Sequence, residues 1–174
     1  NLPPQQILDD AAAKGVTVRI SAHPRADASN TLFNYFDRMA LTYNEAARTF
    51  GGDLTKMPVA PALLHLPEGT QLFSKSFEAM ELMNSNKFIC LEPLNSTSCP
   101  SGSRQFDYVV DEVMKDYMNF LSYGFLVTGI GDSDSHKLME EQNGFPRTYV
   151  FVGAGRDVPS STTLTADVKA GLLP

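Results

Sequence analysis

The pattern of residues near the start of the chain predicts a short helix followed by a strand. Two prolines precede residues 5–14 and Gly15 follows them, which is typical of a helix with proline at its start and glycine after its end. In residues 16–22 apolar side chains alternate with polar ones, as in a strand with one buried face. The predicted strand runs directly into His23 and Pro24. A histidine therefore lies at the strand end where α/β proteins bind ligands.

The second half of the chain shows the same alternation of predicted elements. Residues 77–83 fit either a strand that ends at Asn84 or a turn of helix. Apolar residues recur at helical spacing between Ser103 and Gly124, which predicts the longest helix of the chain. Helices and strands that alternate in this way predict an α/β fold. The remaining predicted elements are a buried strand, another strand and a terminal helix, over residues 125–131, 147–153 and 163–173.

The segment from residue 26 to about residue 75 is less regular. Glycines and prolines interrupt it repeatedly, and only residues 34–48 suggest short helices. A segment of this length with so weak a pattern predicts an insertion or lid rather than part of the core. Its aromatic residues could line a substrate pocket or form a core of the insertion itself: Tyr35, Phe36, Phe50 and Phe73.

Composition and charge argue against some classes of binding partner. The chain has 174 residues, enough for a single domain with its own core. Its 20 acidic and 14 basic residues give a net charge of −6, which argues against nucleic acid and anionic membranes as partners. No apolar run reaches the roughly 18 residues of a membrane-spanning helix, so we expect a soluble protein. Whether it is cytoplasmic or secreted stays open.

Two cysteines, Cys90 and Cys99, do not decide the compartment. A disulfide between them would indicate an oxidising environment, and two free thiols fit the sequence equally well. Their spacing is not that of a zinc site.

A short run after the predicted strand 125–131 carries the clearest candidate chemistry. Asp134 and His136 are two residues apart, so in extended backbone both side chains point to the same side and can reach one ion. Carboxylate and imidazole are usual ligands of zinc, manganese and iron, and His23 could supply a third. The same Asp-Ser-Asp-Ser-His run is also good turn chemistry. His65 has no candidate partner nearby in the sequence and is expected to be structural or on the surface.

Four segments of the chain resemble one protein superfamily. GIGDSDSHK at residues 129–137, followed by GFPRTYV at 144–150, resembles the last metal motif of the PHP (polymerase and histidinol phosphatase) domain superfamily, most of all its CehA/McbA branch. AHPR at 22–25 resembles the histidine-proline segment of that branch. The other two segments, FEAMELMNSN and DYMNFLSYGFLVTGIG, resemble the stretches that precede the last motif.

The resemblance implies a fold and a chemistry. The fold would be a distorted, TIM-like β/α barrel with a site of two or three divalent metal ions at the carboxyl ends of its strands. The activity would be hydrolysis of a small-molecule phosphoester, or of another ester or a carbamate, by a metal-bound hydroxide. Matched by position, the implied metal ligands are His23, Asp134 and His136, with Glu81 as a further candidate.

The resemblance also implies roles for neighbouring positions. Asn84 matches a residue near the site and would contact the substrate. Arg25 and Arg147 match arginine positions that could hold an anionic substrate group, and Arg147 could equally be a structural ion-pair partner. The expected catalytic residues are Asp134, His136 and Arg147.

The chain also departs from the family pattern. The family begins with an H-x-H strand, and none of the three histidines here forms that motif. We therefore expect residues 1–174 to be a single incomplete PHP-like domain, the C-terminal portion of a barrel, with weak or no turnover alone and with exposed sheet edges that favour self-association. One alternative is a PHP-like binding or scaffold domain that has lost catalysis. The other is a plain α/β domain in which the Asp134 segment is only a turn.

Overall fold

A computed structural model describes the chain in five stretches and three single residues. The described residues are 4–25, 34–57, 73–84, 109–134 and 144–151, with 166, 170 and 171. Their helices are α1 (Pro4–Ala13), α2 (Tyr35–Arg38), the π-helical turn η3 (Val109–Met114) and α4 (Lys115–Ser122). Their strands are β1 (Ile20–Ser21), β2 (Leu41–Asn44), β3 (Thr49–Gly52), β4 (Ala79–Asn84) and β5 (Thr128–Asp132).

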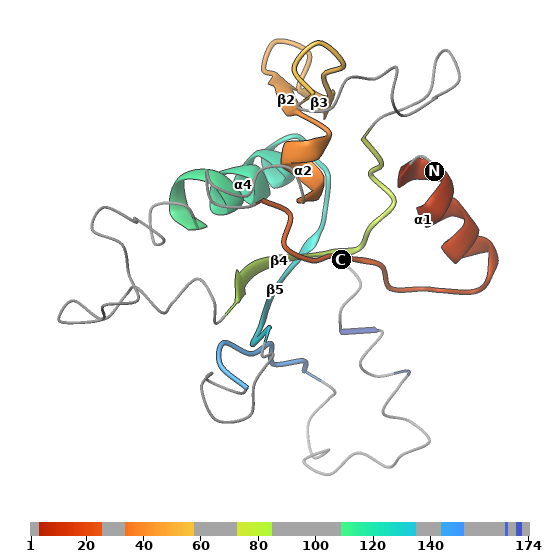
Figure 1. The fold of residues 1–174 in the computed structure, drawn as a ribbon. Helices are drawn as coiled ribbons and strands as arrows, with labels where there is room; N and C mark the ends of the chain where they lie inside the picture. Colours follow the sequence, from red (N-terminus) through yellow and green to blue (C-terminus); the bar gives the residue numbers. More distant parts are fainter. Residues whose placement is uncertain are drawn as a thin grey trace, which may run out of the picture.

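Three strands form a parallel sheet in the order β1-β4-β5 (Figure 1). Ala79 of β4 is paired with Ile20 of β1 on one side and with Thr128 of β5 on the other. This confirms the mixed helix and strand content, and it decides that residues 79–84 are strand rather than helix. The predicted strand over 16–22 is reduced to two paired residues. Within the described residues the sheet does not close into a barrel.

The helix predicted between Ser103 and Gly124 is present over residues 109–122, the part of it that the structure describes. It begins with the π-helical turn η3 and continues as α4, and Gly124 with a φ of 81° follows its end. A positive φ is readily adopted by glycine, which explains why the helix stops there. Helix α1 occupies residues 4–13, nearly the range predicted, and Gly15 also has a positive φ, of 82°.

A cluster of phenylalanine rings makes up half of the buried core among the described residues. Phe120 of α4 is fully buried and stacks on Phe50 of β3, with ring centroids 4.4 Å apart. Phe36 of α2 meets Phe120 edge to face at 5.6 Å. Phe73 and Phe77 complete the cluster beside them. Offset and edge-to-face ring pairs are the preferred aromatic arrangements, so these rings join α4, the β2–β3 hairpin and the approach to β4 into one core.

For the described residues of the segment 26–75, this core corrects the expectation that they lie outside the core. Residues 34–57 and Phe73 were expected to form an insertion or lid, yet Phe36, Phe50 and Phe73 pack in the same core as Phe120. The reason is the length of the elements. Helix α2 and strands β2 and β3 contain four residues each, which is too short for a helical or strand period to stand out in the sequence.

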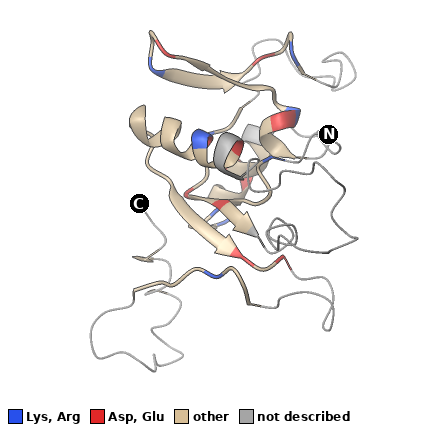
Figure 2. Cartoon of the chain, turned by 90° about the vertical axis from the view of Figure 1, so that its left-hand side faces the viewer, with Lys and Arg blue, Asp and Glu red and all other residues tan. Residues whose placement is uncertain are grey.

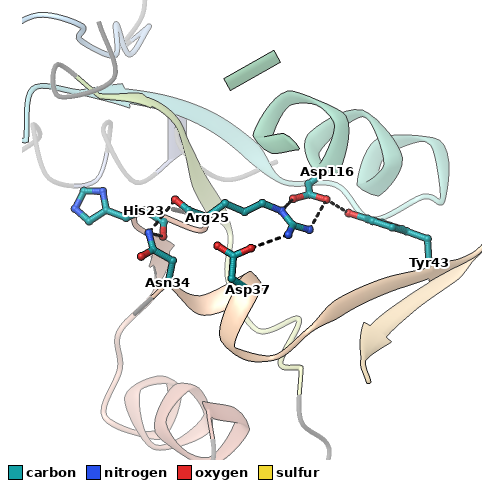
Figure 3. A network of polar contacts seen from close by, with 6 residues as sticks. All are labelled: His23, Arg25, Asn34, Asp37, Tyr43 and Asp116. Atoms are coloured by element: carbon teal, nitrogen blue, oxygen red, sulfur yellow. Dashed lines mark hydrogen bonds and ion pairs between the residues drawn. The ribbon is translucent and has the colours of Figure 1, made fainter. Parts of the chain in front are cut away.

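A largely buried ion cluster joins the same elements to the chain after β1. The Arg25 guanidinium pairs with Asp116 of α4 and with Asp37 of α2, and Tyr43 of β2 donates its hydroxyl to Asp116 (Figure 3). Burial opposes the charge on Arg25, but the hydrogen bonds and charges of Asp116 and Asp37 outweigh it and raise its pKa. Burial, with the negative charge of Asp116, raises the pKa of Tyr43 as well. Arg25 is therefore held as a cation and Tyr43 as a neutral donor.

Replacing Asp116 with alanine is expected to lower the free energy of unfolding by about 3–5 kcal/mol, because it leaves the buried charge of Arg25 without its main partner. Urea unfolding followed by circular dichroism measures this loss. Lys56→Ala is the control, because Lys56 is 66% exposed in its pair with Asp53 and an exposed pair contributes at most about 1 kcal/mol. Equal effects of the two substitutions would contradict a structural role for the Arg25 cluster.

The strand predicted near the C-terminus is not confirmed. Residues 147–151, the described part of the strand expected over 147–153, join no strand. The Thr148 hydroxyl instead donates to the carbonyl of Gly131 at 2.8 Å and accepts from its N–H at 2.9 Å. A side chain thus takes the place of backbone pairing at this edge of β5. Of the terminal helix only residues 166, 170 and 171 are described, each in helical conformation.

No helix in the part of the chain that the structure describes is both long enough and apolar enough to cross a membrane.

Candidate functional site

Ionisable side chains gather at the carboxyl ends of the three parallel strands. His23 follows β1 by two residues, Glu81 lies within β4, Asp132 is the last residue of β5, and Asp134 comes two residues later. Figure 2 shows the acidic residues at the tip of β5 and in the segment just after it. Because the strands are parallel, their carboxyl ends lie at one edge of the sheet and bring these four residues, the strand-end cluster, together.

Glu81 holds His23 at two points. One carboxylate oxygen lies 2.9 Å from the imidazole Nδ1, and the other accepts the backbone N–H of His23 at 3.3 Å. Glu81 is only 4% exposed, so its charge is poorly solvated and depends on these partners. On the other side of the ring, Nε2 lies 3.4 Å from Oδ1 of Asp134. The imidazole therefore lies between two carboxylates.

The carboxylates change the protonation of His23. The hydrogen bond to Glu81 raises the pKa of the imidazole most, burial opposes it, and the negative charges of Glu81, Asp134 and Asp132 raise it further. A raised pKa means that the metal-free cluster favours the charged imidazolium, which balances part of the surrounding negative charge.

Asp132 completes the cluster and was not among the predicted site residues. Burial, the negative charge of Glu81 and a hydrogen bond between the two side chains raise the pKa of Asp132 to about 6. The backbone N–H of Asp134 donates to Oδ1 of Asp132 at 3.1 Å, so this run is also the turn that its residues favour. The spacing of Asp132 and Asp134 is the same i, i+2 spacing that singled out Asp134 and His136, and it could have identified Asp132.

The structure unites only part of the predicted site. Of the predicted metal ligands, His23, Glu81 and Asp134 lie together at the strand ends. Arg25 does not share their cluster, because its guanidinium extends away from the His23 ring into the contacts with Asp37 and Asp116 (Figure 3). In this structure Arg25 pairs with carboxylates of α2 and α4 and does not face the strand-end cluster.

Two further candidate residues lie near the ends of β4 and β5. Arg147 is exposed beside Thr148, with its guanidinium carbon 6.0 Å from the centre of the Tyr149 ring. Asn84 ends β4, and its side chain is not described. The remaining residues singled out in the sequence lie outside the described residues: His65, Cys90, Cys99 and His136.

The strand-end cluster has the donor chemistry of a divalent metal site. Three carboxylates and one imidazole are ligand types for zinc, manganese and iron. Within the described stretches no group of three or more histidine, cysteine, aspartate or glutamate side chains is already arranged to hold an ion. The fit instead rests on charge. The negative charge of Glu81 helps to raise the pKa of Asp132 to about 6, and a bound cation would offset that repulsion.

The comparisons with known proteins identify no relative. No protein-family model matches the chain, and neither the curated proteins nor the solved structures contain a match to it.

Asp132 gives the metal-free protein a testable pH dependence. In the folded protein the pKa of Asp132 is about 6, above the ordinary value of 3.8, so folding disfavours the ionised carboxylate. The free energy of unfolding therefore falls as the pH rises from about 4 through 6 and Asp132 ionises. In EDTA, Asp132→Asn is therefore expected to raise the melting temperature relative to wild type at pH 7.5, and by much less at pH 4.5. Thermal unfolding at both pH values measures this difference.

The matched control is Asp10→Asn on the exposed surface of α1, for which we expect little change at either pH. A melting temperature that Asp132→Asn lowers at pH 7.5 would contradict the unfavourable ionisation of Asp132.

Proposed function

We propose that this chain carries the divalent-metal site of a hydrolase that acts on a small-molecule phosphoester, in a partial β/α barrel of PHP type. The observation that supports it most is the meeting of His23, Glu81, Asp132 and Asp134 at the carboxyl ends of parallel strands. Active sites of β/α barrels are built at this end of the strands. The resemblance of the DSDSH and PRTYV segments to a metal motif supports the same class of function.

The described contacts suggest a division of roles within the cluster. Glu81 accepts from Nδ1 and from the main chain of His23, which is the position of a carboxylate that orients a ligating histidine. His23 through Nε2, with Asp134 and Asp132, would hold the zinc, manganese or iron ion, and the resemblance adds His136. That Glu81 itself ligates the ion stays a prediction. A bound ion would polarise the ester and lower the pKa of water toward about 7.

The chain's own residues then have defined tasks around the substrate. The carboxylates exclude a bare anion from the cluster unless a cation is present, which would make substrate binding depend on the metal. Arg147 is exposed close to the end of β5 and offers a guanidinium to an anionic group of the ester. A phosphoester carries negative charge, so it can bind both to the metal ion and to the Arg147 guanidinium. A neutral carboxylic ester or a carbamate fits these two contacts less well.

Hydrolysis of p-nitrophenyl phosphate tests the proposal. We expect slow release of p-nitrophenol from the chain loaded with Mn²⁺ or Zn²⁺, and none in EDTA or from Asp134→Ala. Arg147→Ala is expected to raise KM more than it lowers kcat, because it removes a binding contact. Release that continues in EDTA, or that Asp134→Ala leaves unchanged, would contradict a metal-dependent mechanism.

A second candidate is a PHP-like domain that binds metal or an anion without catalysis. The absence of an H-x-H motif among the three histidines favours it. Metal that binds at the strand-end cluster, together with no turnover of phosphomonoester, phosphodiester or carboxylic ester, would support this candidate over the hydrolase.

A further inference from the structure

The chain just after β1 is held by a short segment around α2. Three successive carbonyl groups, those of residues 23–25, all accept hydrogen bonds from it. The Asn34 amide donates to the carbonyl of His23 at 2.6 Å and to that of Arg25 at 2.8 Å. The backbone N–H of Phe36 donates to the carbonyl of Pro24 at 2.8 Å. Residues 34–36 therefore fix the course of the main chain at His23.

His23 needs such support because its backbone is strained. Its φ is +43°, in the left-handed region that a residue with a Cβ atom rarely adopts. A residue keeps such a conformation only where its surroundings enforce it. Pro24, which follows, is fully buried, so this turn cannot relax toward solvent.

The strained conformation determines where the imidazole points. In Figure 3 the His23 ring and the Arg25 side chain leave the same turn in opposite directions, with Asn34 against the main chain between them. The ring thereby reaches Glu81 at 2.9 Å and Asp134 at 3.4 Å, while Arg25 reaches Asp37 and Asp116. A change of φ at His23 would swing the ring away from both of its carboxylates.

We propose that Asn34 is a positioning residue for the metal site: its side-chain amide fixes the left-handed conformation of His23 and so directs the imidazole between Glu81 and Asp134. Asn34 acts through the carbonyls of His23 and Arg25, from the segment that the sequence predicted to be an insertion or lid. The inference rests on the proposed metal site for its functional meaning. The effect of Asn34 on the His23 ring can be observed without any metal.

Two variants remove the donor in different ways. Asn34→Ala deletes the amide, and Asn34→Asp keeps its shape but places carboxylate oxygens against two carbonyl oxygens. The first measurement is NMR of the chain labelled with ¹⁵N-histidine in EDTA, with the His23 signal assigned through His23→Gln. In wild type we expect an imidazole N–H resonance protected from exchange by the bond to Glu81. Both variants should lose it.

The second measurement is titration with Co²⁺ followed by its visible absorption. Loss of a residue that orients a metal ligand weakens binding by about 10–100-fold, and we expect an effect of that size for both Asn34 variants. Asn44→Ala is the matched control. Asn44 is exposed in the β2–β3 hairpin, and its side chain accepts the local N–H of Ala47, so both signals should match wild type.

The outcomes separate the inference from the proposed function. If wild type binds no Co²⁺, the metal site is refuted. The positioning role of Asn34 is then still decided by whether the protected His23 N–H signal is lost in the Asn34 variants. If wild type binds Co²⁺ and the Asn34 variants retain both the N–H signal and the affinity, the positioning role is refuted. If both variants fail to fold, Asn34 supports the whole fold and a specific role at His23 is likewise overturned.

Discussion

Replacing Asp134 with alanine is expected to weaken the binding of Mn²⁺ or Zn²⁺ by about 100-fold or more. The reason is that loss of a residue that only orients a metal ligand lowers metal affinity by about 10–100-fold, and Asp134 is proposed to contact the ion itself. His23→Ala should weaken binding to a similar degree, since it removes the imidazole that lies 3.4 Å from Asp134. Isothermal titration calorimetry on the metal-free chain measures both affinities.

The control for this prediction is Asp10→Ala, which removes one negative charge from the exposed surface of α1. It tests whether affinity depends on the net charge of −6 or on the strand-end cluster. A loss of affinity in Asp10→Ala equal to that in Asp134→Ala would mean that ions bind diffusely to an acidic protein.

The second large effect is expected in the aromatic core. Phe120→Ala should lower the free energy of unfolding by about 3–5 kcal/mol, because it removes a fully buried ring and leaves a cavity. Phe120 contacts rings from α2, from β3 and from the approach to β4. Chemical denaturation should therefore remain a single transition when followed either by far-ultraviolet circular dichroism or by tyrosine fluorescence.

Met118→Ala is the control on the same helix, since Met118 is 58% exposed and should cost well under about 1 kcal/mol. Two separate transitions in Phe120→Ala, or in wild type, would show that residues 34–57 fold independently of the sheet. That result would restore the view of this segment as a separate insertion.

Elements with a clear period could be predicted from the sequence. Helix α1 was expected because prolines precede it and Gly15 follows it, and the helix that includes α4 was expected because its apolar residues recur at helical spacing. Strand β5 was expected because a short apolar run ends in turn residues. Positions 77–83 fitted two periods equally well, and only the pairing of Ala79 with Ile20 and Thr128 decides between them.

The short elements could not be predicted because tertiary contacts, and not local pattern, determine them. Four-residue elements such as α2 and β3 are stabilised by rings that meet Phe120 from distant parts of the chain. The same holds for Arg25, whose two acidic partners are 12 and 91 residues away. The sequence shows that Arg25 is charged, but it cannot show that Asp37 and Asp116 neutralise this charge in the folded chain.

Part of the candidate site could be predicted from the sequence for a simpler reason. His23 and Asp134 each follow a predicted strand, and parallel strands bring such positions to one edge. Asn34 left no comparable signal, because its role depends on the left-handed φ of His23 and on two carbonyls that only the folded chain presents. Sequence identified residues with ligand chemistry, whereas the structure identified the residues that hold them.

Metal content tests the central claim most directly. The purified chain is incubated with excess Mn²⁺, Zn²⁺ or Fe²⁺, separated from free ions by gel filtration and analysed by mass spectrometry beside Asp134→Ala. We expect close to one retained ion per wild-type chain and a clear loss in the variant. Wild-type protein that retains no divalent ion under any of these conditions would contradict a metal site at the ends of β1, β4 and β5.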